Sequence, residues 1–323
     1  MSGPPVVAID LGGTKIRSIV VDADGLILGE DRRETAADEG QVRVVARLLA
    51  SAHEAIAASG VAFSALLGVG VSAPGPVDFE RGILYQPPNL PGWDAVPLAK
   101  VLEDRLGLPT FLENDANAAA LGESRYGAGQ GARHMIYLTI STGIGGGLIL
   151  DGRLYRGADG SAGELGHMTV DDSGPPHTCG QRGCLEVMAS GTAIARMARE
   201  AVATGRSELL ARLAASEDEL SAIEVDRAAD AGDPVAQEIL AKASHYLGVG
   251  FANYLNIFNP EVIVIGGGVS RIGRQLLDPA IALAKQRAFR LPARTVEFRK
   301  AALEGRAEVL GVAALARESV AAR

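Results

Sequence analysis

The sequence has few aromatic residues, few cysteines and no excess of positive charge. Phe, Trp and Tyr make up 4% of its 323 residues, so the core must be built from aliphatic side chains and closely approaching backbone. Its formal net charge of -8 argues against a broad nucleic-acid-binding surface, which would need clustered Lys and Arg. The two cysteines, Cys179 and Cys184, provide no disulfide framework.

Long apolar runs are absent as well. The most apolar stretch, residues 135–150, contains Thr139, Ser141, Thr142 and four glycines, which makes it too short and too polar to cross a bilayer. Met1–Pro5 shows no basic segment followed by an apolar one, so no secretory signal is visible. We therefore expect a soluble, cytoplasmic protein. With 47% hydrophobic and 22% charged residues, global disorder is excluded.

The sequence contains a repeated pattern of strand, glycine-rich turn and strand. It appears first in residues 6–21 and again in residues 134–151, where the glycine-rich turn is expected at residues 141–147 and the returning strand at residues 148–151. The chain is long enough for about two domains. The repetition predicts a duplicated α/β domain in which each copy offers one phosphate-facing hairpin.

Other segments are predicted from hydrophobic periodicity and from glycine and proline positions. Helices are expected over Gln41–Ser59, from Pro97 to about Leu106, from Asn114-Asp115 onward, over 192–258 with breaks near Gly205 and Gly232, and from about Arg306. Strands are expected at 66–71, 110–112, 262–265 and 295–298. The segment 233–258 has too many apolar positions for one narrow face, which suggests that part of it is core and part is a subunit contact; these positions are Val235, Ile239, Leu240, Leu247, Phe251 and Leu255.

Three glycine-rich turns are candidates for phosphate binding, because glycine lets backbone amides surround phosphate oxygens. The first turn offers Gly12, Gly13, Thr14 and Lys15, with Asp10 before it to help hold Mg²⁺ through water. The second offers Thr142 and Gly143, and the third offers Gly267 and Gly268. Each turn alone could be a plain hairpin or a tight strand-to-helix connection, and none has the spacing of a Walker A loop or a Rossmann fingerprint. The three together favour ATP as a ligand.

An acid lies at a predicted helix start, in Glu113-Asn114-Asp115. Asn114 or Asp115 could serve only as a helix N-cap. A carboxylate there could also accept the proton of a hydroxyl that attacks phosphorus, which is the one base that phosphoryl transfer requires. Asp115 is the candidate general base.

Four potential metal ligands fall close together in a chain with only five His and two Cys: His167, His177, Cys179 and Cys184. Two His and two Cys form a suitable tetrahedral set for structural Zn²⁺, although an exposed His177 beside two free thiols is the alternative. Glu164 and Glu186 flank the cluster. Their carboxylates could accept hydrogen bonds from sugar hydroxyls, or they could be ordinary surface glutamates.

These motifs resemble those of the ROK family of bacterial sugar kinases and related repressors, over essentially the whole chain. Asp10-Leu-Gly-Gly-Thr-Lys15 resembles the first phosphate motif, Ser141-Thr-Gly-Ile-Gly-Gly-Gly147 the second, and Gly266-Gly-Gly-Val-Ser270 the adenosine-side motif. Glu164-Leu-Gly-His167 and Cys179-Gly-Gln-Arg-Gly-Cys184-Leu-Glu186 resemble the zinc signature. The sequence departs from the family pattern at His177, where a cysteine is expected; histidine is a competent zinc ligand.

The resemblance implies a fold, an activity and a set of sugar contacts. The fold would be the duplicated actin-like (ribonuclease H-like) ATPase architecture, with a smaller lobe of residues 1–115 plus about 304–323, a larger lobe of residues 116–303 that carries the zinc-binding loop, and a cleft between them. Asp115 would be the base. The sugar contacts would be Gly75, Asn89, Asn114, Asp115, Glu164, His167 and Glu186.

The predicted activity is ATP-dependent phosphorylation of a hexose, most simply glucose at its 6-hydroxyl. N-acetylmannosamine, N-acetylglucosamine, fructose and mannose remain alternatives, because their kinases share nearly all of these residues. A sugar-responsive repressor is the alternative of another class, but the first strand begins at about Val6 and leaves no room for a preceding winged helix. A sugar-binding protein without catalysis is the third. Hexose and ATP are the expected partners, with no nucleic acid or membrane, and family members are commonly homodimers or homotetramers.

Overall fold

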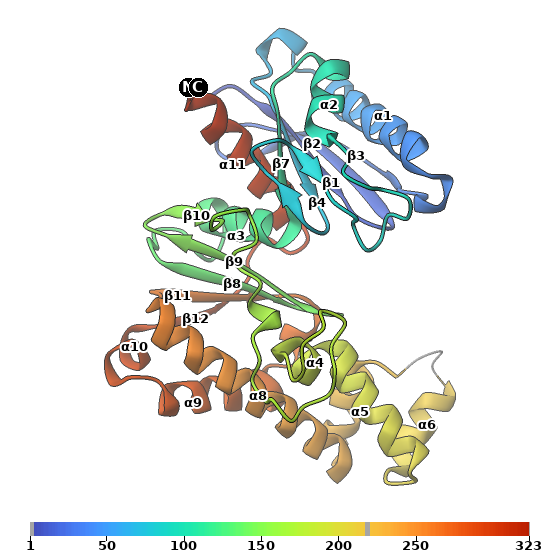
Figure 1. The fold of residues 1–323 in the computed structure, drawn as a ribbon, viewed down its shortest axis with the longest axis vertical. Helices are drawn as coiled ribbons and strands as arrows, with labels where there is room; N and C mark the ends of the chain where they lie inside the picture. The colour runs from blue at the N-terminus through green and yellow to red at the C-terminus, as the bar shows by residue number, and fades with distance from the viewer. Residues whose placement is uncertain (1–2, 217–219, 323) are drawn as a thin grey trace. The chain divides into compact units, whose positions relative to one another are not determined.

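The computed structural model describes residues 3–216 and 220–322, which form two compact units (Figure 1). Unit 1 comprises the chain up to Arg133, Gly147–Gly163 and the chain from Ala301 onward. Unit 2 comprises His134–Gly146 and Glu164–Lys300. The lobes expected from the sequence begin and end elsewhere, since they place residues 116–133 and 147–163 in the larger lobe. That lobe assignment stays a prediction.

The first sheet has five strands in the order β3-β2-β1-β4-β7. They are β1 (Val6–Leu11), β2 (Lys15–Val21), β3 (Ile27–Glu34), β4 (Val69–Ala73) and β7 (Thr110–Asn114). The strands β1, β2 and β3 pair antiparallel, while β4 is parallel to both β1 and β7. A separate pair, β5 (Val77–Asp78) and β6 (Ile83–Leu84), lies outside this sheet.

The second sheet repeats the same order, β10-β9-β8-β11-β12. Its strands are β8 (Met135–Ile140), β9 (Ile144–Leu150), β10 (Arg153–Tyr155), β11 (Val262–Gly266) and β12 (Glu297–Lys300). As in the first sheet, the central strand β8 is parallel to β11, and β11 is parallel to β12. The duplication predicted from the repeated hairpins is therefore confirmed.

One detail of the second hairpin was predicted wrongly. Gly145, Gly146 and Gly147 lie within β9 and not in the turn, which is limited to residues 141–143. A Cβ at Gly146 would lie 2.6 Å from Leu165 Cδ1, and one at Gly147 would lie 2.6 Å from Ala120 Cβ. Gly146 and Gly147 let neighbouring side chains pack closely against β9. Only part of the glycine-rich segment therefore forms the turn.

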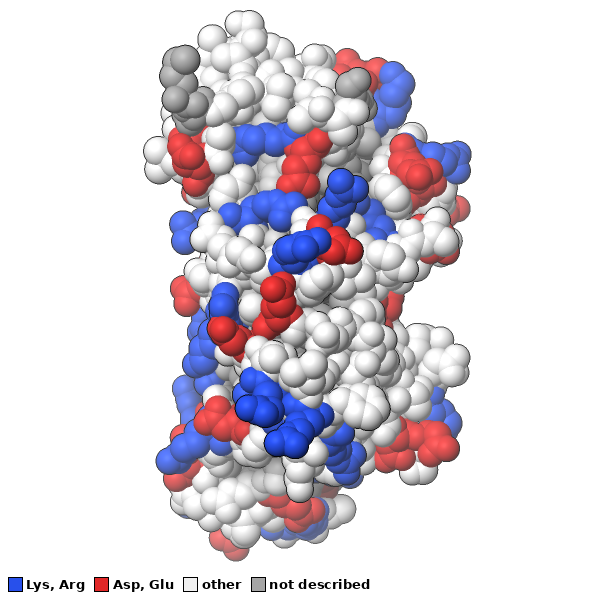
Figure 2. All heavy atoms as spheres, turned by 90° about the vertical axis from the view of Figure 1, so that its left-hand side faces the viewer, with Lys and Arg blue, Asp and Glu red and all other residues white. Residues whose placement is uncertain are grey.

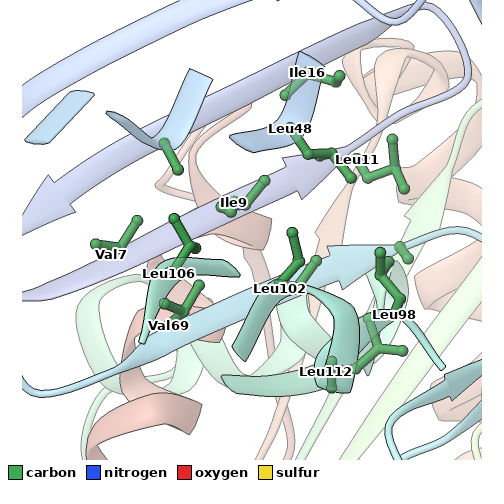
Figure 3. Packing of buried hydrophobic residues seen from close by; sticks show 14 of the residues in the cluster. Val7, Ile9, Leu11, Ile16, Leu48, Val69, Leu98, Leu102, Leu106 and Leu112 are labelled. Atoms are coloured by element: carbon green, nitrogen blue, oxygen red, sulfur yellow. The ribbon is translucent and has the colours of Figure 1, made fainter. Parts of the chain in front are cut away.

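The core of unit 1 lies between one face of its sheet and two helices, α1 (Gln41–Ser59) and α2 (Leu98–Leu106). Figure 3 shows Ile9 and Leu11 of β1 beside Leu48 of α1 and Leu102 of α2, all of them fully buried. The bounds of α1 were predicted correctly, since it ends at Gly60 in the left-handed conformation. Pro97 is the N-cap of α2 and lies just before its first turn, and Gly107 ends the helix as expected.

The opposite face of that sheet packs on α11 (Ala307–Ala321), which also crosses α3 (Asp115–Tyr126). A Cβ at Gly70 of β4 would lie 1.9 Å from Val312 O, and one at Gly311 would lie 1.7 Å from Ala118 O. Only glycine permits such close backbone approach. Short 3₁₀ turns at Ala37–Glu39 and Phe63–Ala65 complete unit 1.

Unit 2 is mainly helical around its strands. Its α-helices are α4 (Leu185–Ala189), α5 (Gly191–Ala203), α6 (Glu208–Ser216), α7 (Ala222–Asp230), α8 (Pro234–Phe258), α9 (Asp278–Arg287) and α10 (Arg290–Thr295). Shorter turns occupy η3 (Leu165–His167), η4 (Gly268–Arg271) and η5 (Gly273–Leu277). The breaks predicted near Gly205 and Gly232 are both present.

The apolar excess of α8 is explained by the chain's own core. Val235, Ile239, Leu240, Leu247, Phe251 and Leu255 are all buried. They are therefore not evidence for a subunit contact.

The face shown in Figure 2 carries basic and acidic side chains among one another. Along the chain such charges are often paired, as in Arg196–Glu200 at 2.8 Å and Arg125–Glu318 at 2.6 Å. Across residues 3–216 and 220–322, no helix combines the length and the apolar character needed to cross a membrane.

Candidate functional site

The first glycine-rich turn joins β1 to β2 and is fixed by backbone and hydroxyl hydrogen bonds. Gly12 N–H donates to Lys15 O at 2.9 Å, and the Thr35 hydroxyl donates to Gly12 O at 2.7 Å. A Cβ at Gly13 would lie 2.5 Å from the Cβ of Asn89. The structure thus places the predicted phosphate turn directly against a predicted sugar residue.

Asp10 is the residue before the last in β1 and lies close to the carboxylates of Glu308 and Asp115, a grouping that the sequence alone did not reveal. Burial, with the nearby carboxylates of Glu308 and Asp115, raises the pKa of Asp10 to about 7, although Ser72 and Arg17 act in the opposite direction. Burial also raises the pKa of Glu308, in the first turn of α11. Sequence reasoning missed Glu308, because a glutamate at a helix start is ordinary and its 298-residue separation from Asp10 gives no signal.

Asp115 is the first residue of α3, and Asn114 is its N-cap. The Asn114 side-chain oxygen accepts from Ala116 N at 2.9 Å and Asn117 N at 3.3 Å, and its amide donates to Gly75 O at 3.2 Å. The cap therefore holds the predicted sugar loop at Gly75 and the start of α3 together. Asp115 lies at the positive end of the helix dipole, which favours its anionic form.

The second and third turns lie at the ends of adjacent parallel strands. β8 runs into Ser141–Gly143, and β11 runs into Gly267 and Gly268; Thr139 is paired with Gly266 in register. A Cβ at Gly267 would lie 2.3 Å from Ile140 O, whereas a Cβ at Gly268 would meet nothing within 4 Å. Thr142 O accepts from Thr192 N at 3.3 Å, at the start of α5. The carboxyl ends of parallel strands are a frequent place for ligands in α/β folds.

The four predicted metal ligands converge in unit 2. One donor atom from each of His167, His177, Cys179 and Cys184 lies within 4.8 Å of every other. Cys179 Sγ is 3.6 Å from Cys184 Sγ and 3.2 Å from His177 Nδ1. A tetrahedral ion with Zn–S bonds near 2.3 Å would separate two sulfurs by about 3.8 Å, so the donor set fits zinc.

Two further features of the cluster agree with metal ligation. His167 Nδ1 is buried and has no hydrogen-bond partner among the described residues. Hydrogen bonds from the Gln181 backbone and from neighbouring side chains lower the pKa of Cys179 to about 6, while burial and the adjacent Cys179 raise that of Cys184 to about 11. A divalent cation would stabilise both thiolates.

Glu186 connects this cluster to the second turn. Its Oε1 lies 2.9 Å from His177 Nε2, and its Oε2 accepts from Ile144 N at 2.7 Å. A carboxylate on the far nitrogen of a metal-binding histidine fixes the ring and its tautomer. Glu164 approaches His167 more loosely, at 3.7 Å between Oε2 and Nε2.

The chain is similar to known sugar kinases over most of its length. The ROK family profile matches residues 6–319. A glucokinase of Thermotoga maritima is 42% identical over 274 residues, which cover 85% of each chain.

Two solved structures match the fold over nearly the full length. The ROK hexokinase of Thermus thermophilus has a TM-score of 0.84 at 38% identity and covers 99% of this chain and 100% of its own. A ROK glucokinase of Streptomyces griseus, in complex with glucose and AMPPNP, has a TM-score of 0.78 at 36% identity, with coverage of 97% and 99%. The fold is the predicted duplicated actin-like architecture, and the chain belongs to the ROK family.

Proposed function

We propose that this protein is an ATP-dependent hexose kinase that phosphorylates the 6-hydroxyl of glucose. The observation that carries the proposal is the capped start of α3, where Asp115 follows the Asn114 cap beside the first phosphate turn. The similarity to glucokinases and to a glucokinase in complex with glucose and AMPPNP supports glucose and ATP as the substrates.

In this reaction Asp115 accepts the proton of the sugar hydroxyl while the hydroxyl oxygen bonds to the γ-phosphorus and ADP leaves. We assign Gly75, Asn89 and Asn114 to the sugar in unit 1, and Glu164, His167 and Glu186 in unit 2. The backbone amides of Gly12 and Gly13, with Thr14 and Lys15, and those of Thr142 and Gly143 would contact phosphates. Gly267 and Gly268 would contact the adenosine side.

Asp10 is the residue that would hold Mg²⁺ with ATP, through water. The divalent ion would neutralise charge on the phosphates as the transfer proceeds. With a pKa of about 7, Asp10 is partly protonated near neutral pH. A nearby cation would favour its ionised form.

We further propose one structural zinc per chain, held by His167, His177, Cys179 and Cys184. Support comes from the short distances between the donors, from His167 Nδ1, which no described residue pairs with, and from the Glu186 carboxylate that lies 2.9 Å from His177 Nε2. Four protein ligands leave no open position for a reactive water, so the ion would order the loop and take no part in the chemistry.

A coupled phosphotransfer assay over a panel of hexoses tests the activity directly. Glucose should give the highest kcat/KM with ATP as donor, and the panel should include N-acetylmannosamine, N-acetylglucosamine, fructose and mannose. A faster reaction with another sugar would contradict glucose as the substrate. Sugar binding without phosphate transfer to any member would indicate a sugar-responsive regulator or a binding protein.

A homodimer or homotetramer is also proposed. Its support is a set of exposed apolar side chains in unit 2: Ile257 of α8, and Phe289 and Leu291 at α10. Phe289 N donates to Asn256 Oδ1 at 2.8 Å, which ties the start of α10 to the end of α8. Light scattering at micromolar concentration should give a multiple of the chain mass of 33.4 kDa. A mass of one chain would contradict it.

A further inference from the structure

The segment that carries Asn114 and Asp115 is preceded by a buried carboxylate, Glu113, which the proposed chemistry does not use. Its side chain is 3% exposed and its two oxygens are both engaged. Oε2 accepts from Arg156 Nε at 2.6 Å, and Oε1 accepts from Asn114 N at 3.0 Å and Asn117 Nδ2 at 3.2 Å. Glu113 thus contacts the backbone of the residue next to Asp115 and a side chain in the first turn of α3.

Arg156 links Glu113 to two other segments of unit 1. Its guanidinium lies 4.8 Å from the ring centroid of Phe79, which follows β5. Gly160, at a φ of +92°, closes the loop after Arg156 onto β5, where a Cβ would lie 2.9 Å from Val77 O. Arg156 therefore bridges Phe79 and Glu113, and the loop that follows it packs on β5.

A buried carboxylate is stable as an anion only when it is paired, and removal of one partner leaves the other charge unpaired. An arginine suits this position because its planar guanidinium can stack on a ring and donate in a fixed direction at the same time. Because Asn114 and Asp115 follow Glu113 directly, a displaced Glu113 would move both.

We propose that Arg156 and Glu113 form a positioning pair that fixes Asn114 and Asp115 in the geometry for phosphoryl transfer. Neither side chain has to touch the reacting atoms. The inference rests on the proposed function and adds to it two residues that act through the base.

The first test is Arg156→Met, which keeps most of the side-chain length and removes the charge. The kcat for sugar phosphorylation should fall by about tenfold to a hundredfold, because small misplacements of reacting groups lower the rate by such factors. The KM for ATP should stay within about twofold. Arg153→Met, an exposed arginine of the preceding strand β10, is the matched control and should behave as wild type.

A double variant distinguishes positioning by a charge pair from general support of the fold. In Arg156→Met, Glu113 is buried without its partner. Glu113→Gln combined with Arg156→Met removes the unpaired charge, so this double variant should recover part of kcat.

If Arg156→Met does not fold, Arg156→Lys and Glu113→Gln carry the test. Each should lower kcat below that of wild type and leave the KM for ATP within about twofold, because Arg156→Lys loses the planar fork and Glu113→Gln loses the charge that the fork binds.

The inference is overturned if folded Arg156→Met has a wild-type kcat, or if only the KM values rise. It is also overturned if the loss of kcat in the double variant equals the product of the losses in the two single variants. A wild-type protein inactive on every hexose would instead overturn the proposed function, so the two failures can be told apart.

Discussion

Asp115 is the residue on which the proposed phosphoryl transfer depends most. It begins α3, its Oδ1 accepts from Ala116 N at 2.8 Å, and its charge raises the pKa of Asp10. Asn114 provides the helix cap, so the capping role and the catalytic role fall on neighbouring residues. A change at Asp115 can therefore be read as a change in chemistry with little loss of the cap.

Asp115→Asn should lower kcat by about a hundredfold to ten-thousandfold, because a general base typically supplies that factor. The amide is nearly isosteric, so the fold and the affinity for ATP should persist. Steady-state kinetics with calorimetry would measure both. Asp104→Asn on α2, an exposed acid paired with Lys100, is the matched control. A variant that retains more than about a tenth of the wild-type kcat would exclude Asp115 as the base.

At the scale of elements, the glycine-rich turns differ in how cleanly they can be tested. A side chain at Gly13 would collide with Asn89, so it would disturb a proposed sugar contact together with the phosphate turn. Gly268 begins η4 and has no positive φ. Apart from its chain neighbours and the backbone of its own helix, no described residue has an atom within 4 Å of the point that a Cβ would occupy. A methyl group there would therefore disturb a bound ligand far more than the fold.

Gly268→Ala should raise the KM for ATP about tenfold, since an extra methyl in a filled site typically costs ~1–3 kcal/mol. The free energy of unfolding should not fall, and the KM for the sugar should change little. Gly273→Ala, which also has open space, is the control and should keep the wild-type KM for ATP. Equal ATP kinetics in the two variants would argue against a nucleotide at η4.

The loop between β10 and α4 is the second element with a direct test. We expect one zinc per chain by elemental analysis, with two nitrogen and two sulfur donors by X-ray absorption. His177→Ala should lower the zinc content and raise the KM for the sugar more than that for ATP, because His167 and the loop that carries Glu186 lose their order. His245→Ala, an exposed histidine of α8, should retain full zinc. Active protein without stoichiometric zinc would contradict the assignment.

At the scale of the whole molecule, the acidic group around Asp10 links stability to pH. Burial, together with the carboxylates of Glu308 and Asp115, raises the pKa of Asp10 from 3.8 to about 7. The folded state then binds a proton more tightly than the unfolded state between these pH values. Stability from this group is therefore lost as pH rises from about 4 to about 7.

Asp10→Asn should accordingly have a higher free energy of unfolding than wild type at pH 8, and a weaker dependence between pH 5 and pH 8. Chemical denaturation at both pH values, without Mg²⁺ or ATP, would measure it. Asp38→Asn, at a more accessible acid in the same unit, should follow the wild-type dependence. The same pH dependence in Asp10→Asn as in wild type would contradict the role of Asp10.

Local sequence determined the elements and the motifs. The apolar spacing of Gln41–Ser59 and the glycine after it set the bounds of α1, because helix periodicity and a left-handed cap are local properties. The two hairpins predicted the duplication, and the His/Cys spacing predicted a cluster whose donors the fold brings within 4.8 Å of one another. These features depend on neighbours along the chain.

Tertiary structure decided whatever depends on residues far apart in the sequence. The glycines at 145–147 lie in β9, where Leu165 and Ala120 pack closely against two of them, and the apolar surface of α8 is core because the rest of unit 2 covers it. Glu308 beside Asp10, and Arg156 on Glu113, are joined only by the fold. Burial and charge pairing depend on which residues are close in space. Hydrophobic periodicity along the chain does not say which distant residues the fold brings together.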